Sequence, residues 1–332
     1  MKRPKENGTK ANSSGRKATK TRRTMARRKG TVGIIGLGIM GGSFARNLVK
    51  AGWRVIGFDV SPSRRRDLAR AGVEMAKDPT AVAVAAPTII TSLPKPAALH
   101  DVVKDIAAAK LPRKALVEAS TFNLSDKEKA ERVMRRAGHV MLDCPMSGTG
   151  AQARTGDLVV YASGDSGAIA RLKPMFAGFA RKTYAVGPFG HGSRMKFVAN
   201  LLVAIHNVAA AEAMVLGMKA GLDPDSLLDM VQSGAGNSRV FELRAPMMAA
   251  NDYRDATMKC SVWQKDLDVI AAFAKTSRTP VPLFSTTLPL YEEALRRGYG
   301  DQDTAAVCAV LERRAKFQRP RRAKKPSKRA SR

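Results

Sequence analysis

Two residues four positions apart, Lys196 and Asn200, are the part of this sequence best suited to acid–base chemistry. They lie in a mostly apolar segment predicted to be helical, so this spacing places both side chains on one face. A buried amine has a lowered pKa and can exchange a proton with a hydroxyl near neutral pH, while a carboxamide one turn further on can orient that oxygen. The alternative is a surface lysine whose stem lies along the helix and whose ammonium stays in water.

A glycine motif far upstream predicts a bound dinucleotide. The motif G-x-G-x-M-G is made by Gly36, Leu37, Gly38, Ile39, Met40 and Gly41. It follows an apolar run and opens a helix-like segment, so Gly36 would permit the tight turn, Gly38 would let backbone approach a pyrophosphate, and Gly41 would allow close packing of the helix. Asp59 follows Gly36 by 23 residues, where an acid would accept hydrogen bonds from the adenosine ribose. A purely structural turn is the alternative; with Lys196, however, the motif indicates a hydride-transfer enzyme.

The acid at position 59 also predicts which nicotinamide cofactor is bound. The carboxylate of Asp59 would repel a 2′-phosphate, and Val60 next to it carries no positive charge. NAD is therefore the predicted cofactor. NADP is the alternative, because the run Arg64-Arg65-Arg66 is close enough to bind a phosphate.

Two further segments could contact a substrate. In Asp143–Gly150, the small residues Ser147, Gly148 and Thr149 follow a strand end, and their backbone N–H groups and hydroxyls suit a carboxylate. An ordinary turn explains this segment equally well. Lys265, beside Asp266, could reach the cofactor or substrate from a second domain, or it could be part of an exposed helix pair.

The order of predicted elements up to about residue 191 indicates an α/β fold with a doubly wound parallel sheet. Short β-branched runs alternate with helix-like segments, which is the βαβ pattern of a Rossmann-type domain. Strands are predicted at 31–35, 54–59, 88–92, 115–118 and 140–143, and helices at 39–51, 62–71, 97–107 and 125–137. The runs 158–162 and 182–186 are predicted to be further strands at the edge of this sheet.

The sequence pattern changes after Gly192, and the rest of the chain up to residue 314 is predicted to be almost entirely helical. Helices are expected at 195–221, 225–233, 263–276, 283–297 and 303–314, with His191 and Ser193 as loop residues before the first of them. We therefore predict a dinucleotide-binding domain at 31–191 and a helical domain for substrate and oligomerisation at 192–314.

The net charge of +30 is concentrated at the two ends of the chain. Residues 1–30 and 313–332 each carry a net +11, which leaves +8 for the 282 residues between them. Both ends are nearly free of large apolar residues, so 1–30 and 315–332 are predicted to be disordered. Weak, salt-sensitive contact with nucleic acid is one interpretation of these tails, and a solvated extension without a partner is the other.

Other features restrict the class of protein. Three scattered cysteines and four histidines without ligand spacing predict neither a disulfide framework nor a metal site, and they fit a reducing, cytoplasmic location. No apolar stretch is predicted to span a bilayer, and the basic N-terminal segment lacks the apolar region of a secretory signal.

The motifs together resemble the β-hydroxyacid dehydrogenases, the 3-hydroxyisobutyrate dehydrogenase family that includes tartronate semialdehyde reductase. The resemblance runs from about Thr31 to Arg314. In the family's order, the matching motifs are the glycine turn, Leu93-Pro94, Ser120-Thr121, D-x-P-x-S-G at 143–148, G-x-x-x-K-x-x-x-N at 192–200, and K-D-L at 265–267.

The resemblance implies a role for each matching position. Lys196 would be the catalytic acid–base group and Asn200 would orient the substrate, whose carboxylate Ser147 and Gly148 would bind. The residues expected to contact the cofactor are Leu93, Pro94, Thr121 and Lys265. The resemblance also implies a Rossmann domain joined by a long helix to a helical domain that forms homodimers or homotetramers.

Three departures from the family pattern lie near these substrate contacts. Thr149 replaces the second glycine of S-G-G, Trp263 and Gln264 alter the surroundings of the K-D motif, and Leu124 stands where the S-T-x-x-P pattern has proline. These changes leave the substrate open.

The function predicted from the sequence is NAD(P)-dependent hydride transfer between the cofactor and a small 3-hydroxy acid or its semialdehyde. The first alternative is a related reductase of imines or other carbonyl compounds. The second is a nucleic-acid-associated protein that reuses a dehydrogenase fold and binds through its tails.

Overall fold

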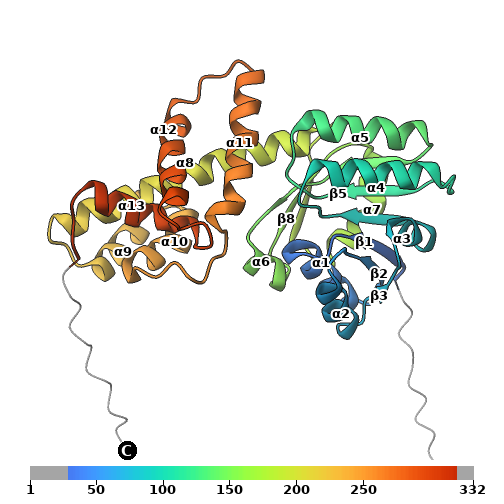
Figure 1. The fold of residues 1–332 in the computed structure, drawn as a ribbon, viewed down its shortest axis with the longest axis horizontal. Helices are drawn as coiled ribbons and strands as arrows, with labels where there is room; N and C mark the ends of the chain where they lie inside the picture. The colour runs from blue at the N-terminus through green and yellow to red at the C-terminus, as the bar shows by residue number, and fades with distance from the viewer. Residues whose placement is uncertain (1–28, 320–332) are drawn as a thin grey trace, which may run out of the picture.

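The computed structural model describes residues 29–319, which form a sheet-containing part followed by a helical part (Figure 1). The first part is built on a six-stranded sheet with the order β3-β2-β1-β4-β5-β6, in which every neighbouring pair is parallel. Its strands are β1 (Thr31–Ile35), β2 (Arg54–Phe58), β3 (Glu74–Met75), β4 (Thr88–Thr91), β5 (Ala115–Glu118) and β6 (Val140–Asp143). The predicted doubly wound α/β fold is confirmed.

Apolar residues on both faces of the strands require helices on both sides of this sheet. Along β1, Val32 and Ile34 pack into one apolar cluster and Ile35 packs into another, and all three are nearly inaccessible to solvent. The helices of this part are α1 (Ile39–Lys50), α2 (Pro62–Arg70), α3 (Pro79–Ala85), α4 (Pro96–Ala108), α5 (Leu124–Arg136), α6 (Gly150–Thr155) and α7 (Ser166–Phe176). The four helices predicted here, α1, α2, α4 and α5, agree with the structure to within one residue at each end, whereas α3, α6 and α7 were not predicted.

A separate small sheet corrects one prediction. The runs expected at the edge of the large sheet are β8 (Val159–Ala162) and β9 (Lys182–Ala185), which pair with β7 (Met146–Ser147) in a three-stranded sheet of their own. A bridge between Asp143 and Ser163 joins this sheet to the end of β6. The chain therefore turns after β6, which places the half-buried Ser147 at the junction of the two sheets.

The long helix α8 (His191–Lys219) runs from the sheet-containing part into the helical part (Figure 1). The remaining helices are α9 (Pro224–Ser233), α10 (Arg239–Ala250), α11 (Cys260–Thr276), α12 (Pro282–Arg296), the 3₁₀ turn η1 (Thr304–Ala306) and α13 (Val307–Arg314). Two corrections follow. Helix α8 begins at His191, so His191 and Ser193 are helical and not loop residues, and α10 was not predicted. Pro246 lies inside α10 and Arg244 is buried, so this segment shows no simple apolar stripe.

Helix α8 qualifies as a membrane span by length and composition, contrary to the expectation that no stretch is long enough. One helix of the described residues meets this criterion, and half of its apolar window is buried inside the protein. Its buried residues include Lys196, Asn200 and Asn207. These contacts are those of a core helix.

The predicted C-terminal tail begins later than residue 315. Phe317 packs against the helical core, and Arg319 donates hydrogen bonds to Glu312 and to the carbonyl oxygens of Met248 and Ala249. The rest of this tail and residues 1–28 of the other lie outside the described residues.

Candidate active site

The glycine turn between β1 and α1 has the shape of a phosphate cradle. Gly36 has a φ of +91°, and a Cβ there would lie 2.2 Å from the carbonyl oxygen of Ser92. A Cβ on Gly41 would lie 1.9 Å from the carbonyl oxygen of Gly36. Above Gly38 the space is open, since the nearest atom to a Cβ at that position would be Arg64 Nη1 at 3.9 Å. Helix α1 begins there with no side-chain cap and no acid in its first turn, so its N–H groups fit an anionic pyrophosphate.

The acid predicted to bind the ribose lies beside this turn and is held rigidly. Asp59 is buried, its Oδ2 accepts a hydrogen bond from the Leu37 N–H at 2.7 Å, and its Oδ1 accepts one from the Ser61 N–H at 2.8 Å. The half-exposed guanidinium of Arg64 lies 3.4 Å from Oδ2. A buried carboxylate therefore lies directly beside the glycine turn, with an arginine close enough to pair with it.

This arrangement predicts the effect of removing the charge of Asp59. In Asp59→Asn we expect KM for NADPH to fall about tenfold relative to that for NADH, because a like charge no longer faces the 2′-phosphate and Arg64 is released to bind it. Steady-state kinetics with both cofactors measures the ratio. Asp67→Asn, which removes an exposed acid of α2, is the matched control; equal ratios in the two variants would contradict the assignment.

The other predicted cofactor contacts gather at the carboxyl ends of β4 and β5. The Leu93 N–H donates to Ser120 Oγ at 2.9 Å, so the loops that carry Leu93, Pro94 and Thr121 are tied together. Lys265 reaches this place from α11, and its ammonium lies 5.4 Å from the centre of the Phe122 ring. The sheet-containing part and the helical part therefore meet where the cofactor contacts are predicted.

The predicted carboxylate turn is shaped by one required glycine and one hydrogen bond that the sequence did not predict. Gly148 has a φ of +133°, and a Cβ there would lie 2.5 Å from Leu158. Thr149 caps α6, and its backbone N–H donates to Gln152 Oε1 at 3.0 Å. That N–H is thus already bonded within the chain, and the Thr149 side chain accepts from the backbone N–H of Gln152 in the same capping box, which leaves the Ser147 hydroxyl and the Gly148 N–H for a substrate.

The side chain of Lys196 is buried at the start of α8, with a relative exposure of 9%. Burial lowers the pKa of this amine; the carboxylate of Asp266 opposes the shift, and the nearby charge of Lys265 adds to it. Asn200 donates from Nδ2 to Asp266 Oδ2 at 3.0 Å, which fixes the carboxamide and leaves its second N–H free. The surface alternative for Lys196 is excluded by its burial.

A buried cluster of charges fixes the beginning of α8. The ammonium of Lys127 lies 2.7 Å from Glu118 and 2.8 Å from Asp143, and all three side chains are inaccessible to solvent. Asp143 also accepts hydrogen bonds from the N–H of Ser193 at 2.7 Å and from its hydroxyl at 2.8 Å. The ends of β5 and β6 therefore hold the first turn of α8, three residues before Lys196. No sequence motif indicates this cluster, because its members are distant in the chain.

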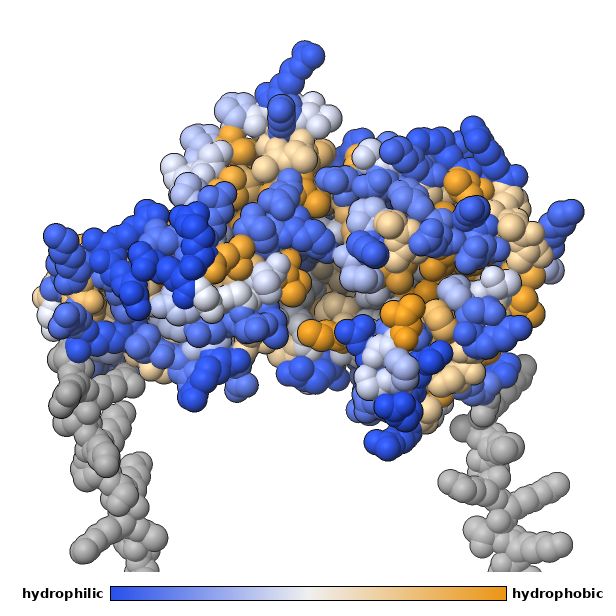
Figure 2. Space-filling view, viewed as in Figure 1, coloured by the Kyte–Doolittle hydropathy of each residue, from blue (hydrophilic) through white to orange (hydrophobic). Residues whose placement is uncertain are grey.

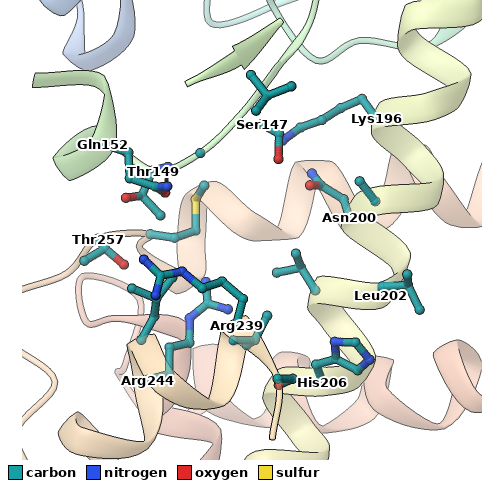
Figure 3. Close-up of a pocket in the computed structure, with 18 of the residues that line it drawn as sticks. Ser147, Thr149, Gln152, Lys196, Asn200, Leu202, His206, Arg239, Arg244 and Thr257 are labelled. Atoms are coloured by element: carbon teal, nitrogen blue, oxygen red, sulfur yellow. Dashed lines mark hydrogen bonds between the residues drawn. The ribbon is translucent and has the colours of Figure 1, made fainter. Parts of the chain in front are cut away.

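One cavity of about 850 Å³ brings the catalytic and substrate-binding candidates together (Figure 3). In Figure 3, Lys196 extends from α8 toward Ser147, and Asn200 lies one turn along the helix. The space-filling view shows a hollow between the two parts of the molecule, with apolar residues around it (Figure 2). All five residues predicted for catalysis and substrate binding line the cavity: Ser147, Gly148, Thr149, Lys196 and Asn200.

Several polar residues of the cavity were not predicted from the sequence. They come from α6, the middle of α8, α10 and the loop before α11, and are Gln152, His206, Ser238, Arg239, Arg244 and Thr257. Helix α10 was not predicted, so no signal placed its two arginines near Lys196. Among residues 29–319, no group of three His, Cys, Asp or Glu side chains could hold a metal ion, and the three cysteines are buried and free.

Comparison with known proteins gives matches along nearly the whole described chain. Residues 31–187 match the family model of the NAD-binding domain of 6-phosphogluconate dehydrogenase, and residues 190–311 match that of the NAD-binding domain of NADP-dependent 3-hydroxyisobutyrate dehydrogenase. An L-threonate dehydrogenase of Cupriavidus necator is 32% identical over 84% of this chain and 95% of its own. An NAD-dependent L-serine dehydrogenase of Pseudomonas aeruginosa is 30% identical over 83% of this chain and 96% of its own.

A solved structure shows the same architecture. The crystal structure of a 3-hydroxyisobutyrate dehydrogenase from Salmonella typhimurium is 34% identical and superposes with a TM-score of 0.76, covering 84% of this chain and 99% of that one.

Proposed function

Because the chain belongs to the β-hydroxyacid dehydrogenase family and is an NAD(P)-dependent hydroxyacid dehydrogenase, we propose that it acts on a small 3-hydroxy acid or the matching semialdehyde, with Lys196 as the acid–base group. The observation that carries this proposal is the burial of the Lys196 amine in the cavity that also contains Ser147 and Gly148. Only the neutral form of the amine can take a proton, and burial lowers the pKa of Lys196, which favours that form.

Four residues of the cavity have separate tasks in the proposed reaction. The Ser147 hydroxyl and the Gly148 N–H bind the substrate carboxylate, and the free N–H of Asn200 orients the substrate oxygen. Lys196 takes the proton of the hydroxyl group during oxidation and returns it to the carbonyl oxygen during reduction. When bound, the nicotinamide cofactor supplies the hydride acceptor or donor. The residues that would hold it are those of the glycine turn, together with Asp59, Leu93, Pro94, Thr121 and Lys265.

The test is a spectrophotometric screen in which NADH and NADPH are offered with small semialdehydes and with imines that lack a carboxylate, and NAD and NADP with 3-hydroxy acids and 2-hydroxy acids. The proposal expects the highest kcat/KM with a 3-hydroxy acid or its semialdehyde. Faster turnover of 2-hydroxy acids, or of imines without a carboxylate, would contradict it. The resemblance to an imine reductase of Streptomyces aurantiacus, at 19% identity, shows a shared fold alone.

The role of Asp266 gives a further prediction about pH. Oxidation needs the neutral amine, so its rate rises with pH through the pKa of Lys196, and the Asp266 carboxylate raises that pKa. In Asp266→Asn we expect the pKa of Lys196 to fall further, so that the pH range in which the rate of oxidation rises, the rising limb of the pH profile, moves to lower pH. A pH profile of kcat/KM measures the shift, with Asp268→Asn, an exposed position of the same helix, as the control. A limb that moves to higher pH would contradict this role.

The expected assemblies and location stay predictions. An exposed apolar side chain of α8 outside the cavity, Leu216, supports a homodimer or homotetramer formed through the helical part. Contact of the basic tails with nucleic acid concerns mostly residues outside the described part of the chain. A cytoplasmic location is our expectation for the enzyme.

A further inference from the structure

More positively charged side chains line the cavity than are needed to bind one substrate carboxylate. Its lining contains four Lys or Arg residues and a single acid, Asp157. Asp157 is paired with Arg181 at 2.8 Å, so these two charges offset each other. The remaining cations are Lys196, Arg239 and Arg244. Lys196 lies beside the carboxylate turn, whereas both arginines belong to α10 and lie near Thr257, across the cavity from α8 (Figure 3).

Arg244 is a buried cation without a hydrogen-bond partner. Its side chain is 8% exposed, and its Nε lies 3.4 Å from Asp303 without forming a hydrogen bond. Within residues 29–319, none of its guanidinium nitrogens donates a hydrogen bond to protein. A buried charged donor left unbonded is unfavourable. This side chain therefore has unused donors in a cavity wall.

Asp303 does not satisfy these donors, because its own oxygens are bonded elsewhere. Its Oδ2 accepts hydrogen bonds from the N–H and the hydroxyl of Thr257 and from the N–H of Met258, at 2.8, 2.9 and 3.1 Å. Its Oδ1 accepts hydrogen bonds from the N–H of Ala305 at 3.0 Å and from the Thr304 hydroxyl at 3.4 Å. The carboxylate stabilises the arginine through space and leaves the guanidinium fork free.

The second arginine can turn toward the same region. Arg239 pairs with Glu242 at 2.7 Å, but its side chain is 68% exposed, and such a pair on a helix surface contributes little. A guanidinium binds carboxylate or phosphate oxygens through two parallel N–H groups. Two guanidinium groups on one wall suit an anion better than a neutral chain end.

We propose that Arg239 and Arg244 form a second anion subsite, so that the preferred substrate is a hydroxy acid with a further carboxylate or phosphate at the end remote from the first carboxylate. This inference rests on the proposed function, because the first carboxylate is assigned to Ser147 and Gly148 and the reacting hydroxyl to Lys196. It adds the chemical class of the substrate.

The test compares matched substrates. 3-Hydroxyglutarate is paired with 3-hydroxypentanoate, 3-hydroxyadipate with 3-hydroxyhexanoate, and 3-hydroxy-4-phosphooxybutanoate with 3,4-dihydroxybutanoate. We expect kcat/KM to be at least ~10-fold higher for the doubly charged member of one pair than for its singly charged partner. A difference in either dicarboxylate pair would assign the subsite to a carboxylate, and a difference in the phosphorylated pair would assign it to a phosphate. Equal or lower values for all three doubly charged substrates, with the singly charged ones oxidised, would overturn the subsite and leave the proposed function intact.

Variants assign the effect to the two arginines. In Arg239→Gln and Arg244→Gln the preference for the doubly charged substrate should fall ~10-fold. Arg296→Gln, an exposed arginine of α12, should retain it. If Arg244→Gln does not fold, the exposed Arg239→Gln still decides. A preference unchanged in Arg239→Gln would contradict the assignment.

A binding measurement separates failure of the subsite from failure of the proposed reaction. Thermal unfolding of the full chain is followed with glutarate, inorganic phosphate and butyrate as probes. Glutarate or phosphate should raise the unfolding temperature of the wild type more than that of Arg239→Gln. Butyrate should not raise the unfolding temperature of the wild type more than that of the variant. If no hydroxy acid is oxidised, the proposed reaction is wrong, but a larger rise of the unfolding temperature in the wild type still supports the subsite. Equal rises of the unfolding temperature in the wild type and in Arg239→Gln would overturn the subsite.

Discussion

Replacing Lys196 with methionine is expected to lower kcat for hydride transfer at least ~100-fold, in either direction, as general acid–base groups of this kind contribute. The side chain is buried at the junction of α8 with the carboxylate turn, and methionine fills a similar volume without a titratable group. Cofactor binding should persist, because the glycine turn and Asp59 are unaffected. Stopped-flow absorbance of NADH measures the chemical step, and quenching of protein fluorescence measures cofactor affinity.

The matched control is Arg194→Met, two residues earlier on the same helix and exposed to solvent. It removes a positive charge from the same turn without touching the cavity, so its kcat should stay within a factor of about two of the wild type. A Lys196→Met enzyme with the activity of this control would show that another group moves the proton.

The second large effect is expected in stability and comes from Lys127. In Lys127→Met the carboxylates of Glu118 and Asp143 remain buried without their cation, which should lower the free energy of unfolding by ~3–5 kcal/mol. Burial alone would lower the pKa of Lys127, but the two carboxylates more than offset this and raise it. The stability that it contributes is therefore fully present below its unfolded pKa, about 10.4, and is lost as pH rises through the folded value. Urea unfolding at neutral pH measures the difference.

Lys129→Met provides the comparison for this variant. Lys129 lies on the same helix, α5, and its side chain is exposed. Its replacement should change the free energy of unfolding by less than about 0.5 kcal/mol. If the unfolding curves of Lys127→Met and Lys129→Met coincide, the buried cluster does not stabilise the fold.

The elements that the sequence predicted well are those whose signals are local. β-Branched runs between glycine and proline turns locate five strands of the six-stranded sheet, all but the two-residue β3, and the G-x-G-x-M-G motif locates its phosphate turn, because both signals depend on neighbours in the chain. Lys196 and Asn200 lie one turn apart on the same helix for the same reason.

The features that the sequence did not predict depend on contacts between distant segments. The pairing of β8 with β7 is set by the turn after Asp143, and the early start of α8 by hydrogen bonds from Ser193 to that same carboxylate. The N–H of Thr149 donates a hydrogen bond to Gln152, and no sequence motif indicates this contact. Arg244 lies inside a helix without an apolar stripe, so only the folded chain brings it to the cavity.

The central claim is that the Lys196 amine carries the proton, and the pH dependence of oxidation tests it most directly. Wild-type kcat/KM is predicted to rise about tenfold per pH unit below a pKa lower than the 10.5 of an ordinary lysine. In Lys196→Met the residual rate is predicted to lack this limb. The same limb, with the same midpoint, in the methionine variant would contradict the account.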